Sequence, residues 1–145
     1  MPGIIVGVDG SSHSQRALEW AAREAALRHA PLTVLTVHQA VRGYFGGVTP
    51  YPGDVEQTEK ARVAAQAETD KVLAGLADKP DSVTVRAVHG IPAEELIHAS
   101  QDADMIVLGS RGGGGFSRLR MGSVAHHVTH QATRPVVLIP PERDD

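Results

Sequence analysis

The residues best suited to chemistry lie in a glycine-rich stretch between positions 109 and 124. An apolar run over 105–108 stops at Gly109, and Gly122-Ser123 opens a segment with helical periodicity. This order predicts a buried strand, a glycine-rich loop and the start of a helix. Small residues allow backbone N–H groups to approach an anion, and the helix dipole favours negative charge at that point. The stretch therefore predicts a phosphate-binding loop.

The distribution of charge supports an anionic ligand. Residues 105–141 contain four arginines and no acid, in a chain whose formal net charge is −3. A local positive field of this size suits a small polyanion. A nucleic acid usually requires a wider basic face with accessible aromatic side chains, so we expect no nucleic-acid partner.

The glycine spacing carries more information than the glycine content. Gly109, Gly112 and Gly122-Ser123 form the pattern G-x2-G-x9-G-[ST]. This pattern resembles the nucleotide-binding signature of the universal stress protein family, in its ATP-binding branch. The resemblance extends to Val-Gly-Val-Asp-Gly-Ser near the start, Val-His after the second predicted strand, and His-Gly-Ile-Pro before the third predicted helix.

The resemblance implies a set of nucleotide contacts. Asp9 would lie near the ribose or phosphates, and the backbone of Val37 would pair with adenine. The signature glycines would line the ribose and triphosphate, while the start of the last helix would hold phosphate. Arg111 occupies a variable position of the signature, and its role is inferred from its charge alone. The predicted nucleotide-binding residues are Asp9, Gly10, Ser11, Val37, Gly109, Arg111, Gly112, Gly122, Ser123 and Val124.

Five apolar runs and four helical patterns alternate along the chain. The strands are expected at 3–8, 32–38, 83–88, 105–108 and 136–139, and helices at 14–28, 55–76, after Pro92 and after Gly122. Alternation of this kind predicts an α/β fold with a doubly wound parallel sheet and helices on both faces. The strand order 3-2-1-4-5 is assigned partly from the resemblance, and it places Asp9 beside Gly109 at the switch point. Residues 1–141 would form a single nucleotide-binding domain, with a frayed tail at 142–145.

Two segments carry more specific expectations. The helix at 55–76 is expected to bury a face traced by Val63, Ala64, Ala67, Val72 and Leu76. The glycine- and proline-containing segment 39–53 is too long for a bare connector. Segments of that length in compact domains are usually functional lids or disordered.

Several single residues have more than one interpretation. Asp9 and Ser123 are each suited to helix capping, a role compatible with ligand binding. His126 and His130 have the i, i+4 spacing of a two-histidine metal site, but a solvated or partly packed helix face is favoured. No lysine lies in the glycine loop, which argues against a Walker A motif.

The composition excludes several functional classes. Without cysteine there is no disulfide and no thiolate chemistry, and no apolar run is long enough to span a membrane. We therefore expect a cytoplasmic protein without a membrane partner. The final apolar strand, at 136–139, would be an edge strand, which predicts a homodimer through the pairing of two such strands.

The expected function is regulatory binding of ATP, with Mg²⁺ carried on the phosphates. No general base is spaced for phosphoryl transfer, and no second carboxylate accompanies Asp9, so catalysis would be slow ATP hydrolysis at most. One alternative is a slow ATPase or nucleotidyl transferase in the same cleft. Another is a stress protein that binds no nucleotide and acts through dimer-mediated interaction.

Overall fold

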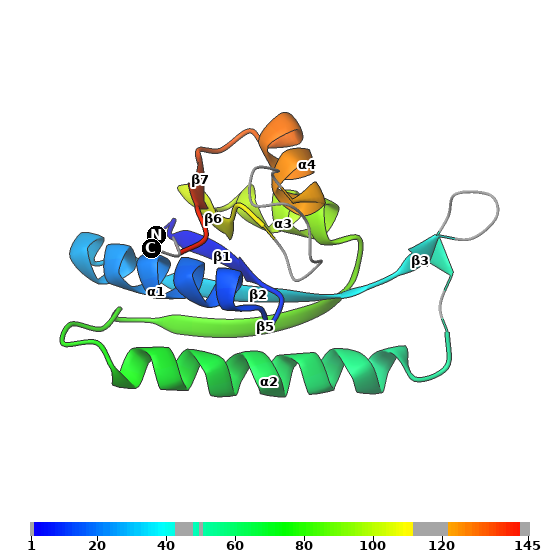
Figure 1. The fold of residues 1–145 in the computed structure, drawn as a ribbon, viewed down its shortest axis with the longest axis horizontal. Coiled ribbons are helices and arrows are strands. Elements are labelled where there is room, and N and C mark those ends of the chain that lie inside the picture. Colours follow the sequence, from blue (N-terminus) through cyan, green and yellow to red (C-terminus); the bar gives the residue numbers. More distant parts are fainter. Residues whose placement is uncertain (1, 43–47, 50, 112–121, 143–145) are drawn as a thin grey trace.

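The computed structural model describes residues 2–42, 48–49, 51–111 and 122–142. Apart from the short strands β3 and β4, its strands and helices alternate along the chain, as the sequence predicts (Figure 1). In chain order the elements are β1 (Ile4–Val8), α1 (Ser12–Arg28), β2 (Leu32–Gln39), β3 (Val41–Arg42), β4 (Val48–Thr49), α2 (Asp54–Ala74), β5 (Val83–Gly90), α3 (Pro92–Ser100), β6 (Met105–Gly109), α4 (Ser123–Gln131) and β7 (Val136–Ile139).

Five of the strands form one parallel sheet in the order β5-β2-β1-β6-β7. In terms of the predicted strands this is 3-2-1-4-5, so the predicted fold class and strand order are confirmed. β1 lies at the centre, where Ile4 is paired with Leu32 of β2 and with Met105 of β6. The chain moves outward from β1 through β2 to β5 and then crosses to the other side of β1 for β6 and β7. The switch point therefore lies between β1 and β6, whose carboxyl ends are side by side.

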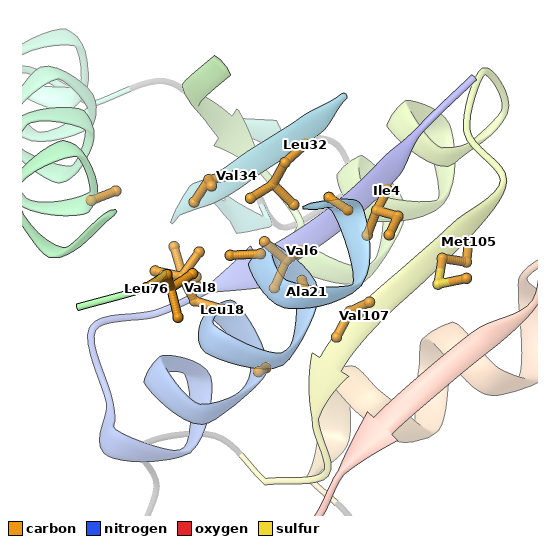
Figure 2. Close-up of a cluster of buried hydrophobic side chains, with 14 residues drawn as sticks. Ile4, Val6, Val8, Leu18, Ala21, Leu32, Val34, Leu76, Met105 and Val107 are labelled. Atoms are coloured by element: carbon orange, nitrogen blue, oxygen red, sulfur yellow. The ribbon is translucent and has the colours of Figure 1, made fainter. Parts of the chain in front are cut away.

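The two faces of the sheet bury separate hydrophobic clusters. On the face covered by α1 and α2, Val6, Leu18 and Val34 are fully buried together with Val107, and Figure 2 shows them around Ala21 of α1. The opposite face, covered by α3 and α4, buries Ile5, Leu35, Leu96 and Ile106 among others. Because the central strands are covered on both sides, they read as continuous apolar runs in the sequence rather than as alternating patterns.

The buried face of α2 differs from the expected one. Val63, Ala64 and Ala67 are exposed, whereas Ala65 and Thr69 are buried. Leu76 is buried as expected, but it lies beyond the end of the helix at Ala74. Alanine and polar residues occur all around this helix, so helical periodicity could not identify one apolar stripe. The packing of α2 against β2 and β5 selects the buried side instead.

The segment 39–53 contains secondary structure that the sequence reading did not predict. β3 and β4 form a short antiparallel pair in which Val41 lies opposite Thr49. Positions 43–47 and 50 lie outside the described residues, and so do 143–145 of the expected frayed tail. Among the helices that the structure describes, none is long and apolar enough to cross a membrane.

Candidate functional site

A cavity of about 340 Å³ opens at the carboxyl ends of the central strands, on the face covered by α3 and α4. Gly7, Val8 and Asp9 line it from β1, and Leu35 and Val37 from β2. Leu108, Gly109 and Arg111 contribute from β6 and its following turn, and Leu96 contributes from α3. The start of α4, residues 122–125, closes another side. This is the switch point at which doubly wound sheets bind ligands, and the volume is in the range of small-molecule sites.

The turn after β1 is held by its own polar side chains. The Asp9 carboxylate accepts hydrogen bonds from the backbone N–H of Ser11 (2.9 Å) and from its hydroxyl (2.5 Å). Ser11 is the N-cap of α1, and its hydroxyl oxygen accepts from the N–H of Ser14. The interpretation of Asp9 as the helix cap is therefore wrong, because Ser11 has that role. Gly10 adopts φ +82°, a left-handed conformation that glycine accommodates without strain.

Ser14 is a site residue that sequence reasoning missed. Its side chain is buried, its hydroxyl donates to the carbonyl of Ser11, and it accepts from the N–H of Asp9 at 3.2 Å. It therefore fixes the backbone at the point where β1 ends and the cavity begins. The sequence pattern that could have indicated this role is a serine in the first turn of a helix, on the same face as its buried alanines.

The start of α4 lines the cavity and has backbone N–H groups that lack an acceptor within the helix. Gly122 is the N-cap, and the first helical hydrogen bond runs from His126 to the carbonyl of Gly122. The N–H groups of Ser123, Val124 and Ala125 therefore have no acceptor within the helix. Within the described residues no side chain caps this end, and its first turn contains no acid. Such a terminus favours an anion.

Two expectations about this helix start are corrected. Ser123 is not the N-cap but the first helical residue. The N–H of Gly122 donates to the carbonyl of Ser110 at 2.7 Å, so it is engaged within the protein rather than free to bind phosphate. Gly122 has φ −65° and ψ 157°, an extended conformation open to any residue. The backbone conformation at position 122 therefore does not require glycine.

The end of β6 approaches the start of α1 closely. A Cβ atom on Gly109 would lie 3.1 Å from the carbonyl oxygen of His13 and 3.2 Å from that of Arg111. The glycine thus permits contact between backbones as well as access to the cavity. Arg111 follows two residues later and is only 9% exposed, so its positive charge lies within the lining rather than in bulk solvent.

The structure brings most of the predicted site residues to this one cavity, although they come from distant parts of the chain. Gly10 and Ser11 lie in the adjoining turn without lining the cavity, and Gly112 lies outside the described residues. The predicted residues in the lining are Asp9, Val37, Gly109, Arg111, Gly122, Ser123 and Val124. The sequence analysis did not predict three leucines of the lining, because an apolar side chain in a strand or helix indicates only a place in the core. These are Leu35, Leu96 and Leu108.

A carboxylate outside the cavity interacts electrostatically with Asp9. Glu68 of α2 has a buried Oε1 with no hydrogen-bond partner among the described residues. Burial raises the pKa of Glu68 above its ordinary value of 4.5, the negative charge of Asp9 raises it further, and Lys71 partly opposes the change. Glu68 does not itself line the cavity. It was missed because the sequence reading assigned a different face of α2 to the core.

We predict that Glu68→Gln stabilises the protein at neutral pH. A carboxyl group whose folded pKa is raised contributes stability below its unfolded pKa, and that contribution is lost as the pH rises through the folded pKa. The glutamine variant should therefore have the higher free energy of unfolding at pH 7.5, and the difference should vanish below about pH 4. Urea denaturation at both pH values measures this. An equal difference at the two pH values would show that ionisation of Glu68 is not its cause.

Comparison with known proteins gives a consistent family assignment. The sequence profile described as the universal stress protein family matches residues 2–140. A universal stress protein of Mycolicibacterium smegmatis is 38% identical over 142 residues, which cover 94% of this chain and 47% of that protein. The chain thus spans about half the length of that relative.

Solved structures agree with the architecture. The universal stress protein UspA of Lactobacillus plantarum has the same fold, with a TM-score of 0.77 at 23% identity, and the match covers 95% of this chain and 97% of that one. A universal stress protein of Archaeoglobus fulgidus, determined in complex with dAMP, is 26% identical with a TM-score of 0.62, covering 96% of this chain and 98% of that one. Taken together with the profile match over nearly the whole chain, these likenesses show that the protein belongs to the universal stress protein family.

Proposed function

We propose that this protein binds ATP in the cavity at the switch point and acts as a nucleotide-dependent regulator. The observation that carries the proposal is that the start of α4, whose first N–H groups have no acceptor within the helix, lines the same cavity as the buried Arg111. A helix N-terminus and an arginine together suit phosphate oxygens. The dAMP complex of the Archaeoglobus fulgidus relative supports an adenine nucleotide as the ligand.

The opposite side of the cavity suits the nucleoside. Register pairing of β1 with β2 ends at Val8 and Thr36, so Val37 extends beyond the β1–β2 pairing. We infer that its backbone pairs with adenine while Leu35 and Leu96 contact the base or ribose. Asp9, exposed at the end of β1, is suited to accept from ribose hydroxyls. Mg²⁺ would enter as an ion carried on the phosphates, because it commonly binds through phosphate oxygens and water.

The lining favours binding over rapid phosphoryl transfer. Among the described lining residues, Asp9 is the carboxylate and Arg111 the cation, and neither histidine nor lysine is present. Efficient transfer needs a group that orients the attacking nucleophile in addition to phosphate neutralisation. We therefore propose that nucleotide occupancy shifts the population of conformations, in the cytoplasm where ATP is available.

The deciding experiment identifies the nucleotide directly. The protein is purified, stripped of bound ligand by denaturation, and the released nucleotide is identified by chromatography. The refolded protein is then titrated with ATP, ADP and GTP in a calorimeter, with and without Mg²⁺. We expect one saturable adenine-nucleotide site per chain. If no nucleotide binds below millimolar concentration, the protein is a family member that works without nucleotide.

We also propose a homodimer formed through β7. β7 is at the edge of the described sheet, and all four of its apolar residues, Val136–Ile139, are only half-buried. An apolar edge strand is an association hazard unless another strand or element covers it. Pairing across a two-fold axis would satisfy its open edge and cover these side chains. Sedimentation at micromolar concentration tests this, and a monomer there would refute it.

A further inference from the structure

The face of the sheet covered by α2 carries a compact group of histidine and carboxylate side chains that the nucleotide proposal does not use. It consists of His38 near the end of β2, His89 near the end of β5, and Asp54 at the start of α2. One potential ligand atom from each residue lies within 4.8 Å of the other two. None of the three lines the cavity. Any ligand of this group is therefore separate from a nucleotide bound there.

The fold places these side chains together through strand register. His38 and His89 are register partners in the parallel pair β2–β5, so their side chains lie on the same face of the sheet. That face is the one covered by α2, because residues of the same parity, Val34 and Val85, belong to the cluster beneath α1 and α2. The two imidazole rings are stacked with centroids 5.4 Å apart. Both therefore meet the first residue of the helix.

The Asp54 carboxylate lies between the two imidazoles. Its Oδ1 is 3.1 Å from His38 Nε2, and its Oδ2 is 3.4 Å from His89 Nε2. The N–H of Tyr51 donates to Oδ2 at 2.7 Å and so fixes the orientation of the carboxylate. This hydrogen bond lowers the pKa of Asp54, and the two histidines lower it further against an opposing effect of burial. The carboxylate is therefore held in one orientation between the two imidazoles.

We propose that His38, Asp54 and His89 bind a divalent transition-metal ion of the zinc class. Two imidazoles and one carboxylate are a ligand set that such ions accept, commonly with an open position for water. With metal–ligand distances of about 2.0–2.1 Å, tetrahedral ligand atoms lie about 3.4 Å apart. The separations of 3.1 Å (Asp54 Oδ1 to His38 Nε2) and 3.4 Å (Asp54 Oδ2 to His89 Nε2) are close to that spacing, and each involves a different carboxylate oxygen. Side-chain exposures of 29%, 18% and 25% leave the site accessible to an ion and its water.

The position of α2 bears on the charge of the site. A helix N-terminus by itself disfavours a cation. Here, however, the first turn of α2 carries Asp54 and Glu56, which oppose the dipole. A bound ion would connect the start of α2 to the ends of two strands and would fix where the segment 39–53 rejoins the body of the domain.

Zinc and cobalt are the probes for the test. Protein without an affinity tag is treated with a chelator, freed of nucleotide, and titrated with Zn²⁺ in a calorimeter at pH 7.5. Co²⁺ is then added as a spectroscopic reporter of coordination. We expect one site per chain with micromolar or tighter affinity. Zinc should also raise the midpoint of thermal unfolding, because the site exists in the native state alone.

Variants of the three ligands connect the binding to the site. His38→Gln, Asp54→Asn and His89→Ala should each weaken zinc binding by at least about a hundredfold, the upper end of what loss of a supporting residue costs. Each variant is first shown to be folded by circular dichroism. The matched control is His126→Ala with His130→Ala, a histidine pair on α4 whose rings lie 4.7 Å apart. Its removal should leave the tight site unchanged.

The outcomes separate a metal site from a purely hydrogen-bonded cluster. Loss of binding and of the zinc-dependent thermal shift in all three folded variants, with the α4 variant unaffected, supports the proposal. Absence of saturable one-to-one binding in the unmodified protein overturns it. Binding that persists in the folded ligand variants, or that disappears with the α4 pair, also overturns it. Because the titration is done without nucleotide, it gives the same result whether or not the cavity binds ATP.

Discussion

Replacing Ser123 by proline should reduce the affinity for ATP about ten- to a hundredfold while leaving α4 folded. The substitution removes one backbone N–H from the start of the helix. A hydrogen bond to a charged group contributes roughly 1.5–3 kcal/mol, which corresponds to that change in affinity. Proline is well tolerated at the first helical position, where its missing N–H has no partner in the helix.

The backbone before position 123 can accept proline without distortion, so the substitution should remove the N–H and change little else. Gly122 has φ −65° and ψ 157°, a conformation that a residue before proline readily adopts. α3 already begins in this way, with Pro92 following Ile91 at φ −92° and ψ 119°. The control is Ser123→Ala, which retains the N–H and loses only the hydroxyl, and its effect should be smaller. Calorimetric titration compares the three proteins. Unchanged affinity in a folded Ser123→Pro variant would remove the start of α4 from the phosphate site.

Leu18→Ala should be the more damaging change for stability, and it should leave the proposed nucleotide site intact. Leu18 is fully buried in the cluster beneath α1, where Figure 2 shows it close to Val8 and Leu76. Truncation of a buried leucine to alanine costs roughly 2–5 kcal/mol through lost burial and the cavity that remains. For a domain of this size that lowers the midpoint of thermal unfolding by roughly 5–15 °C.

The same helix provides the control for this experiment. Leu27 is 77% exposed, so Leu27→Ala should change the free energy of unfolding by less than about 0.5 kcal/mol. Denaturant titrations measure both variants. ATP affinity at a temperature where Leu18→Ala is folded should stay within about twofold of the unmodified protein, because Leu18 lies on the opposite face of the sheet from the cavity. A stability loss below about 1 kcal/mol would contradict the assignment of Leu18 to a tightly packed core.

The elements of this fold follow from local patterns in the sequence. The run Ile4–Val8 is apolar at every position because a central parallel strand is buried on both faces. A run of apolar residues can be recognised from a few neighbouring positions in the sequence. Gly109 at the end of β6 and Gly122 before α4 are likewise local signals, since they mark where regular structure ends and begins. The position of the proposed phosphate-binding stretch therefore did not require the tertiary structure.

The tertiary structure decided which groups are available within that stretch. The N–H of Gly122 is engaged by the carbonyl of Ser110, a contact across the loop that periodicity does not encode. Likewise, Glu68 approaches Asp9 because α2 packs its Ala65–Thr69 side inward, and a helix without a clear apolar stripe does not reveal that side in advance.

The grouping of His38, Asp54 and His89 also depends on tertiary structure rather than on local sequence. Each residue is unremarkable in its own segment, and the 39–53 segment separates the first two while the whole of α2 separates the last two. Strand register places the histidines side by side, and the start of α2 places the carboxylate between them. Local propensity determines where a strand or helix forms, because it depends on neighbouring residues. Contacts between distant segments depend on how the elements pack, and therefore only the folded chain assembles such a group.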